Sequence, residues 1–582
     1  MGGNILPDKF RDGALLVTIF FFSSIALRPN ATIFPLIVAL SGVLFYAPFA
    51  MRSRVSTALL WVVLAAGSGI SKIHASADAL STIGLSLSVL VVGSLLSAGV
   101  VVGASWLHTR LSTRLDTPST QLLVFPALWA TAWYIIASIS PVGYLLTWSV
   151  ANNADGYNWL VPILGPPSKD WLVAAWSVLC SNLVGSWYLG SQPEADEDLL
   201  TMDSTIDTHE AAKSTAAKRK ELVLLVTLSA LILPSLFIDP FPLPIAELKK
   251  LTPLSVACIL PPFDRYKHHV LTLEDFVDES KKFRHLARVI LWPEGAVKFH
   301  NRTHREESFK SIREQLPGTY IGVAFEETGP DPTDLQGHKS ISQNGLALLS
   351  QYSENPLFVY YKRHLVPGEC SFYICLHSNW PPGVESFSLT HSTNPAPYVD
   401  IEIPNPKGIT RPDWAPAPNH TRPLPVSASI CLDFAHPRLF ADLPGRPALI
   451  LGPARTWDRT IGNTMWLQAK QRAEEIGSTL LWCDGGEGAV SGVAGKGISD
   501  IQVGQGSFAR TVAFEYPFES GSKTVFGRIG YGSLVLFWLL AFGPGALVTY
   551  GPRGKLRFVK NTFDKLVNRR RSGERELLIH HD

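Results

Sequence analysis

A chain of 582 residues is longer than a single hydrophobic core usually organises, so at least two structural units are expected. The positive mean hydropathy of +0.15 and a charged fraction of only 17% indicate that one unit lies in lipid. The net charge is +2, and no basic stretch alternates with aromatic residues, which excludes nucleic acid as an expected partner.

Eight hydrophobic runs are candidates for crossing a bilayer, which takes about 20 apolar residues each. No small-residue cleavage pattern follows the first run, so it is interpreted as a retained span rather than a removed signal peptide. The segment 142–169 is apolar but interrupted by Asn, Gly and Pro; a surface loop is expected there, with the lining of an entrance as the alternative. The runs fall at 14–28, 31–50, 55–71, 83–107, 121–141, 170–190, 221–239 and 526–549.

Lysines and arginines gather after the even-numbered runs and in the tail, which places these loops in the cytoplasm by the positive-inside rule. Before the tail they are Arg52, Arg54, Arg110, Arg114, Lys213, Lys218, Arg219 and Lys220. The predicted organisation is a membrane domain at 1–239 with seven spans, including a disordered cytoplasmic linker at 191–220; an extracytoplasmic domain at 240–525; a transmembrane helix at 526–549; and a basic cytoplasmic tail at 550–582.

Three reactive residue types follow apolar, β-prone runs inside the predicted outer domain. Glu294 comes after the run 288–292, Lys362 after 357–360, and Cys431 after 427–430. Each side chain is therefore expected at or near the end of a strand, where one sheet can gather a base, a cation and a thiol.

The outer domain holds an odd number of cysteines, so at least one stays unpaired within the chain in an oxidising compartment. An unpaired thiol that follows a strand is a candidate nucleophile. Whether Cys370 and Cys375 pair is left open. Histidines and cysteines lack ligand spacing, so neither a metal site nor a cofactor is predicted. The five cysteines are Cys258, Cys370, Cys375, Cys431 and Cys483.

A cysteine nucleophile needs a base for its proton, a cation for its thiolate, and donors for the oxyanion of the tetrahedral intermediate. Glu294 is suited to the first task and Lys362 to the second and third. The backbone N–H after Cys431 is a candidate second oxyanion donor.

These motifs resemble the carbon–nitrogen hydrolase (nitrilase) superfamily. The resemblance is carried by Trp-Pro-Glu at 292–294, Tyr-Tyr-Lys-Arg-His-Leu-Val-Pro-Gly-Glu at 360–369, and Ile-Cys-Leu-Asp at 430–433. The multi-span unit, the closing helix and Gln-Arg-Ala-Glu-Glu-Ile-Gly at 471–477 are similar to its membrane branch, the apolipoprotein N-acyltransferases.

The resemblance implies a multi-span α-helical membrane protein with an extracytoplasmic α/β domain of the αββα sandwich type. It also implies that Glu294 is the general base, Lys362 the oxyanion stabiliser and Cys431 the nucleophile, with Glu369 as a second active-site carboxylate that orients Lys362 and the incoming amine.

Three departures from the family pattern stand out. The Phe between Val-Pro and Gly-Glu is missing, which shortens the interval from Lys362 to Glu369 by one residue, and Asp433 stands where Glu is usual. The loop 452–458 keeps only Trp457 of the family's pattern. Because that loop shapes the acceptor side, the sequence leaves the acceptor open.

The expected function is transfer of an acyl group from a phospholipid, through a Cys431 thioester, to the amine of a protein N-terminus or a small molecule. Two alternatives stay open: a membrane-tethered amidase or nitrilase that gives the thioester to water, and a non-catalytic scaffold.

Glycosylation sequons at Asn30, Asn301 and Asn419 favour a secretory membrane such as the endoplasmic reticulum if the source is eukaryotic. A bacterial source would place the protein in the inner membrane.

Overall fold

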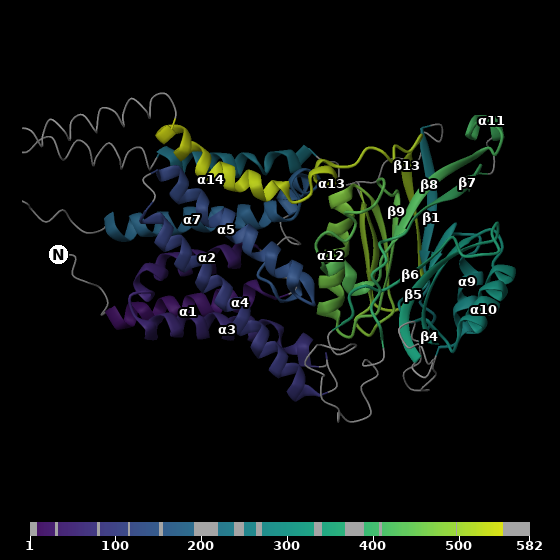
Figure 1. Ribbon diagram of the computed structural model, residues 1–582, viewed down its shortest axis with the longest axis horizontal. Coiled ribbons are helices and arrows are strands. Elements are labelled where there is room, and N and C mark those ends of the chain that lie inside the picture. Colours follow the sequence, from purple (N-terminus) through teal and green to yellow (C-terminus); the bar gives the residue numbers. More distant parts are fainter. Residues whose placement is uncertain are drawn as a thin grey trace, which may run out of the picture.

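The computed structural model shows two units: a helical bundle and a domain built on two β-sheets (Figure 1). It describes residues 8–28, 33–77, 79, 82–114, 117–149, 155–190, 219–237, 250–262, 271–330, 340–366, 389–406, 410–495 and 498–550. Most of the predicted linker, Glu369, Cys370, Cys375 and all but the first residue of the predicted tail lie outside these ranges.

Helices occupy all eight predicted hydrophobic runs. The bundle contains α1 (Asp8–Ala26), α2 (Ile33–Ala50), α3 (Arg54–Ala77), α4 (Ile83–Ser112), α5 (Pro118–Ile139), α7 (Pro167–Gly190), the segment Arg219–Phe237 ending in η3 (Leu233–Phe237), and α14 (Gly532–Tyr550). Among the described residues, five helices are long and apolar enough to cross a membrane: α2, α3, α4, α5 and the segment Arg219–Phe237. In α1 and α14 the apolar stretch is shorter.

Large apolar side chains face outward from these helices. Phe34, Leu96 and Trp187 are each at least two-thirds exposed. Soluble proteins rarely show so much apolar surface, whereas a lipid-facing surface is apolar by nature. The closing helix α14 belongs to the same bundle, because Phe537 packs with Ala127 of α5 and Trp538 Nε1 donates to Thr131 Oγ1 at 3.0 Å.

The second unit has two sheets whose central strands run parallel. The first sheet has the order β13-β1-β2-β4-β5-β6, with β3 paired to β4, and the second has the order β12-β11-β10-β9-β8-β7. The strands are β1 (Leu251–Cys258), β2 (Val289–Leu291), β3 (Val297–Phe299), β4 (Tyr320–Pro330), β5 (Ser340–Ser350), β6 (Phe358–Tyr361), β7 (Tyr398–Pro404), β8 (Thr421–Ala428), β9 (Leu449–Ala454), β10 (Thr479–Asp484), β11 (Val490–Gly495), β12 (Ile498–Val503) and β13 (Phe508–Glu515).

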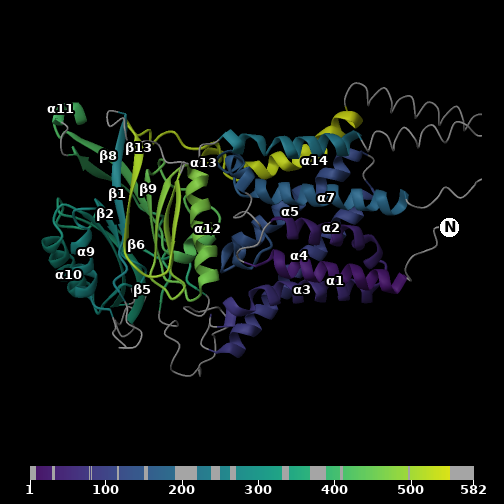
Figure 2. The same cartoon turned by 180° about the vertical axis from the view of Figure 1, so that it is seen from behind.

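Helices cover the outer faces of both sheets and complete an αββα sandwich (Figures 1 and 2). On the first sheet lie α9 (Leu273–Phe283) and α10 (Arg302–Gln315); on the second lies α12 (Arg459–Ile476), between the sheet and the helical bundle. One buried apolar cluster fills the space between the sheets, and another lies beneath α9 and α10. The predicted α/β architecture is present.

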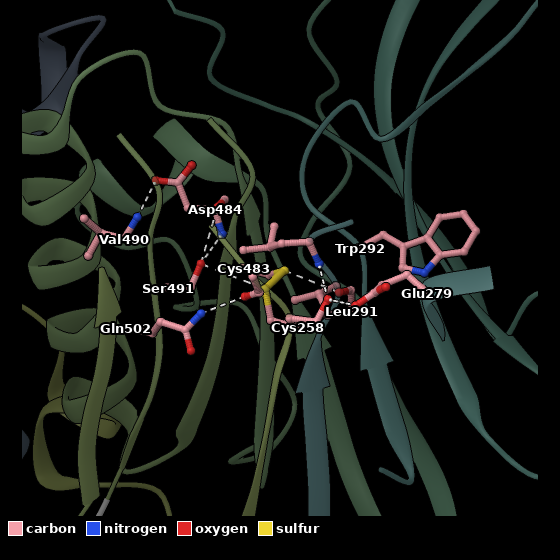
Figure 3. The surroundings of a disulfide bond; sticks show 12 residues. Cys258, Glu279, Leu291, Trp292, Cys483, Asp484, Val490, Ser491 and Gln502 are labelled. Carbon is pink, nitrogen blue, oxygen red and sulfur yellow. Dashed lines mark hydrogen bonds between the residues drawn. A yellow bond between two sulfur atoms is a disulfide. The ribbon is translucent and has the colours of Figure 1, made fainter. Parts of the chain in front are cut away.

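The two sheets are joined by a disulfide between Cys258 of β1 and Cys483 of β10 (Figure 3). Cys483 Sγ also lies 3.4 Å from the carbonyl oxygen of Leu291, at the end of β2. The bond pairs two of the five cysteines counted in this domain. Among the described residues, Cys431 and Cys180 are the free thiols, which agrees with the expectation that one thiol here stays unpaired.

The two units meet along α12 and the segments between the bundle helices. Trp457 Nε1 donates to the Ala75 carbonyl oxygen at 2.9 Å, near the end of α3. Since α3 has 24 residues and is therefore about 36 Å long, Arg54 at its start lies at the far end of the bundle (Figure 1). The basic loop that holds Arg52 and Arg54 is thus on the side opposite the sandwich domain.

Candidate active site

Each predicted catalytic residue follows a strand. Glu294 lies three residues after β2, Lys362 directly after β6, and Cys431 three residues after β8, at the start of the short 3₁₀ helix η5 (Cys431–Ala435). The expectation that one sheet gathers them is wrong: β2 and β6 belong to the first sheet and β8 to the second. The site therefore lies between the sheets, and Glu294 N–H donates to the Ala454 carbonyl of the opposite sheet at 3.3 Å.

Glu294 and Lys362 form a buried ion pair. Lys362 Nζ donates to Glu294 Oε1 at 2.7 Å, and the residues are 1% and 6% exposed. Asn344 Nδ2 donates to the same oxygen at 2.7 Å, and the backbone carbonyl oxygen of Asn344 accepts from the Lys362 backbone N–H at 2.9 Å. A buried charge is tolerated when it is paired and hydrogen-bonded, as these two are.

Cys431 lies beside this pair, 5% exposed. Burial, and then the Glu294 charge, raise the pKa of its thiol well above the usual range; the Lys362 ammonium and a hydrogen bond from the Arg455 backbone N–H act in the opposite direction. The thiol is therefore protonated at rest, with its hydrogen-bonding partner Glu294 placed to remove the proton.

Cys431 occupies a strained backbone position. Cys431 has a φ of +42°, in the left-handed region that side chains other than glycine rarely adopt. Such strain persists only where the surroundings hold the residue in place. The cation of Lys362 and the Arg455 N–H, both of which act on the sulfur, are the groups available to stabilise negative charge that develops next to it.

Asp433 links the segment that carries Lys362 to the turn that begins at Cys431. It is completely buried and accepts hydrogen bonds from Tyr360 Oη at 2.7 Å, Ser429 Oγ at 3.0 Å, and the backbone N–H groups of Arg363 at 3.1 Å and His364 at 2.7 Å. Burial alone would raise the pKa of this carboxyl, but the hydrogen bonds and charge of His364 and the bond from Tyr360 outweigh burial and lower the pKa. Asp433 is thus a charged anchor two residues after Cys431.

The other predicted secondary residues are placed differently. Trp457 lies at the junction with the bundle, where it donates to Ala75, and Glu369 is outside the described residues. The glycine-rich turn that starts at Gly485 lies against the site, because a Cβ at Gly485 would be 2.6 Å from the Pro293 ring.

Three residues that hold the site were not identified from sequence: Asn344, Tyr360 and Arg455. Asn344 lies in the long strand β5 with no reactive neighbours to signal it. Arg455 contributes only its backbone N–H, for which side-chain identity is no guide. Tyr360 was part of the recognised motif, but its bond to Asp433 crosses from one sheet to the other.

A cavity of about 190 Å³ opens at the junction of the two units. It is mostly apolar and also exposes Arg28, Lys72 and Gln468. The buried Gln468 Oε1 has no hydrogen-bond partner within the described part of the chain. From the predicted loop at 142–169 the cavity takes Val142, Tyr144, Leu145, Leu146, Thr147 and Ser149, so part of this stretch lines a cavity. That it forms an entrance to the site stays a prediction.

Glu294, Lys362 and Cys431 are not among the residues that line this cavity, although Val366, four residues after Lys362, is. No group of three or more potential metal ligands occurs among the described residues.

Comparison with solved structures finds weak similarity to a number of chains, of which three are described. The first is the glutamine-dependent NAD⁺ synthetase of Acinetobacter baumannii, with a TM-score of 0.29 and 11% identity over 46% of this chain and 46% of that chain. The second is Nit3 of Saccharomyces cerevisiae, a member of branch 10 of the nitrilase superfamily, with a TM-score of 0.30 and 15% identity over 45% of this chain and 90% of that chain. The third is the NitFhit protein of C. elegans, with a TM-score of 0.30 and 14% identity over 45% of this chain and 60% of that chain. The chain thus spans about half of the synthetase and 60% of NitFhit.

No protein-family model matches the sequence, and no curated protein does. The chemistry assigned to the site rests on the chain's own residues.

Proposed function

We propose that the protein is a membrane-bound acyltransferase that moves a fatty acyl group from a phospholipid to an amine through a thioester on Cys431. The observation that carries the proposal is the buried Glu294–Lys362 pair beside a buried, free thiol. The apolar helical bundle joined to this domain supplies the reason to look for a lipid donor.

In the first half-reaction, Glu294 takes the proton from Cys431 and the thiolate attacks the ester carbonyl of the donor. The ammonium of Lys362 and the Arg455 N–H stabilise the resulting oxyanion. Collapse breaks the carbon–oxygen bond, the leaving lysophospholipid oxygen takes the proton from Glu294, and the acyl group remains on sulfur.

In the second half-reaction, the amine nitrogen attacks the thioester carbonyl and gives a proton to Glu294. The same oxyanion donors act again, the carbon–sulfur bond breaks, and the thiolate of Cys431 recovers the proton. The products are an amide and the resting enzyme.

The junction cavity supports a donor that reaches the site from the bilayer. Its walls are largely apolar, as acyl chains require, and Lys72 and Arg28 offer cations to a phosphate group. The basic loop at the opposite end of the bundle supports an orientation in which the sandwich domain is extracytoplasmic.

A hydrolase is the second candidate, because no triad residue lines the junction cavity. A small polar substrate would then reach the site by another route, and water would replace the amine in the second half-reaction.

A partition assay separates the two functions. The purified protein in detergent micelles receives a phospholipid labelled in its acyl chain, with a short peptide that has a free N-terminus or with the N-acetylated peptide as control. Label on the free peptide only supports transfer. Free fatty acid in equal amounts with both peptides would contradict transfer and favour hydrolysis.

A further inference from the structure

The nucleophile turn is in direct contact with the helical unit. The contact is made by η1 (Gly143–Leu146), which follows α5, and by the two residues before it. Gly143 has a φ of +55°, and a Cβ there would lie 2.1 Å from the carbonyl oxygen of Ala435, the last residue of η5. Only glycine allows the two backbones to approach so closely in this conformation.

A hydrogen bond reinforces the contact. His436, directly after η5, has Nε2 3.2 Å from the Pro141 carbonyl oxygen. Burial, followed by the nearby His364, lowers the pKa of His436 to about 4, so the ring is neutral at pH 7. Since a carbonyl oxygen only accepts, Nε2 of the neutral ring carries the hydrogen and donates it to Pro141.

The same histidine reaches the segment that carries the catalytic lysine. The rings of His436 and His364 stack with centroids 3.6 Å apart and an interplanar angle of 14°. His364 in turn has Nδ1 3.0 Å from Asp433, the buried anchor. A continuous chain of contacts therefore runs from Pro141 in the helical unit to the segments that carry Cys431 and Lys362.

Apolar and charged contacts hold η1 in place from both sides. Val142 and Leu145 pack against the core between the two sheets, and the Leu145 carbonyl accepts from Lys72 Nζ of α3 at 3.2 Å. The guanidinium of Arg472, on α12, lies 5.6 Å from the Tyr144 ring centroid. The segment is thus anchored in both units at once.

We propose that residues 141–145 are a positioning element for the nucleophile, so that the reactive orientation of Cys431 depends on docking of the helical unit. Gly143 and His436 are the positioning residues: neither supplies a proton nor touches the reacting sulfur. The inference rests on the proposed function only in taking Cys431 as the nucleophile, and it extends to the hydrolase alternative.

The principal test is Gly143→Ala in the full-length protein, with Gly103→Ala as a matched control. Gly103 lies in α4 and has no atom within 4 Å of an added Cβ. Two quantities are measured: the rate of Cys431 alkylation by iodoacetamide, read from the Cys431 peptide by mass spectrometry, and the kcat and KM of acyl transfer. A misplaced reacting group costs on the order of 10²-fold in rate. We expect a loss of that size in kcat, altered alkylation, and little change in donor KM.

A second pair of variants keeps the test valid if Gly143→Ala does not fold. His436→Phe retains a ring for stacking but removes the donor to Pro141, whereas His436→Gln retains an N–H donor. We expect the Phe variant to lose kcat and the Gln variant to recover much of it, at equal thermal stability.

Wild-type alkylation and kcat in a folded Gly143→Ala or His436→Phe variant would overturn the proposal. If the wild type transfers no acyl group from phospholipid but Gly143→Ala still changes Cys431 alkylation, the proposed function fails and the positioning element stands.

Discussion

The candidate active site and the junction cavity differ in how their residues are held. Around Glu294, Lys362 and Cys431, each charged group has close partners: Glu294 accepts two hydrogen bonds at 2.7 Å, and Asp433 accepts several. In the cavity, Gln468 Oε1 has no partner in the described chain, and Lys72 reaches one carbonyl oxygen at 3.2 Å. Charged groups that several hydrogen bonds hold in place are preorganised for chemistry, whereas groups with spare bonding capacity are suited to binding.

Removal of the proposed nucleophile, Cys431, should have the greatest effect on activity. Cys431→Ser leaves the buried pair intact but replaces the thiol with a weaker nucleophile, so turnover should fall by about 10⁴-fold or more. Cys180→Ser, which removes the free thiol of α7, should retain activity. Residual turnover of the Cys431 variant near the wild-type rate would show that the site is a scaffold for chemistry located elsewhere.

Breaking the buried ion pair should affect stability as well as activity. Lys362→Met leaves the Glu294 carboxylate buried without its cation, which costs about 3–5 kcal/mol. The pair of the exposed Lys298 and the half-buried Glu326, 2.8 Å apart, provides the control, because Lys298→Met should cost at most about 1 kcal/mol. Denaturant unfolding of both variants measures the difference in the free energy of unfolding. Equal losses would show that the buried pair contributes no more to stability than the pair on the surface.

Loss of the Asp433 charge should produce a pH-dependent change in stability. The pKa of Asp433 is lowered in the folded protein, so its contribution is present above the usual aspartate pKa of about 4 and is lost as the pH falls below that value. The wild type should therefore be more stable than Asp433→Asn at pH 6, with a margin that shrinks toward pH 3. Thermal unfolding of both proteins across this range measures the margin, and a margin independent of pH would refute the charged anchor.

A change in the cavity should have the smallest effect. Lys72→Met removes a cation offered to a lipid phosphate and should raise the KM for phospholipid several-fold, while kcat stays within about twofold. Lys281→Met, on the surface of α9, serves as the control. A fall in kcat without a change in KM would mean that Lys72 acts on the chemistry and that the cavity is not a donor site.

Features that depend on local sequence could be predicted, whereas features that depend on long-range packing could not. Glu294, Lys362 and Cys431 each follow a short β-prone run with a distinctive local motif, so their place at strand ends could be anticipated. The pairing of Cys258 with Cys483 could not, because 225 residues separate them and only the packing of β1 on β10 brings them together.

The junction was harder still to predict. Pro141 was predicted to end the hydrophobic run 121–141, and Gly143 to belong to an irregular loop. Nothing local connects them with Ala435 or His436, nearly 300 residues later. The three motifs were also predicted to lie on one sheet, whereas β2 and β6 belong to one sheet and β8 to the other. Local patterning determines strand ends, but the distance between them depends on tertiary packing.

Intact-protein mass spectrometry after incubation with phospholipid and no acceptor tests the thioester on Cys431. We expect the mass of one fatty acyl group on the wild type, mapped to Cys431, released by hydroxylamine, and absent from Cys431→Ser and Glu294→Gln. An unmodified wild-type protein with intact lipid would contradict the proposal that phospholipid is the acyl donor.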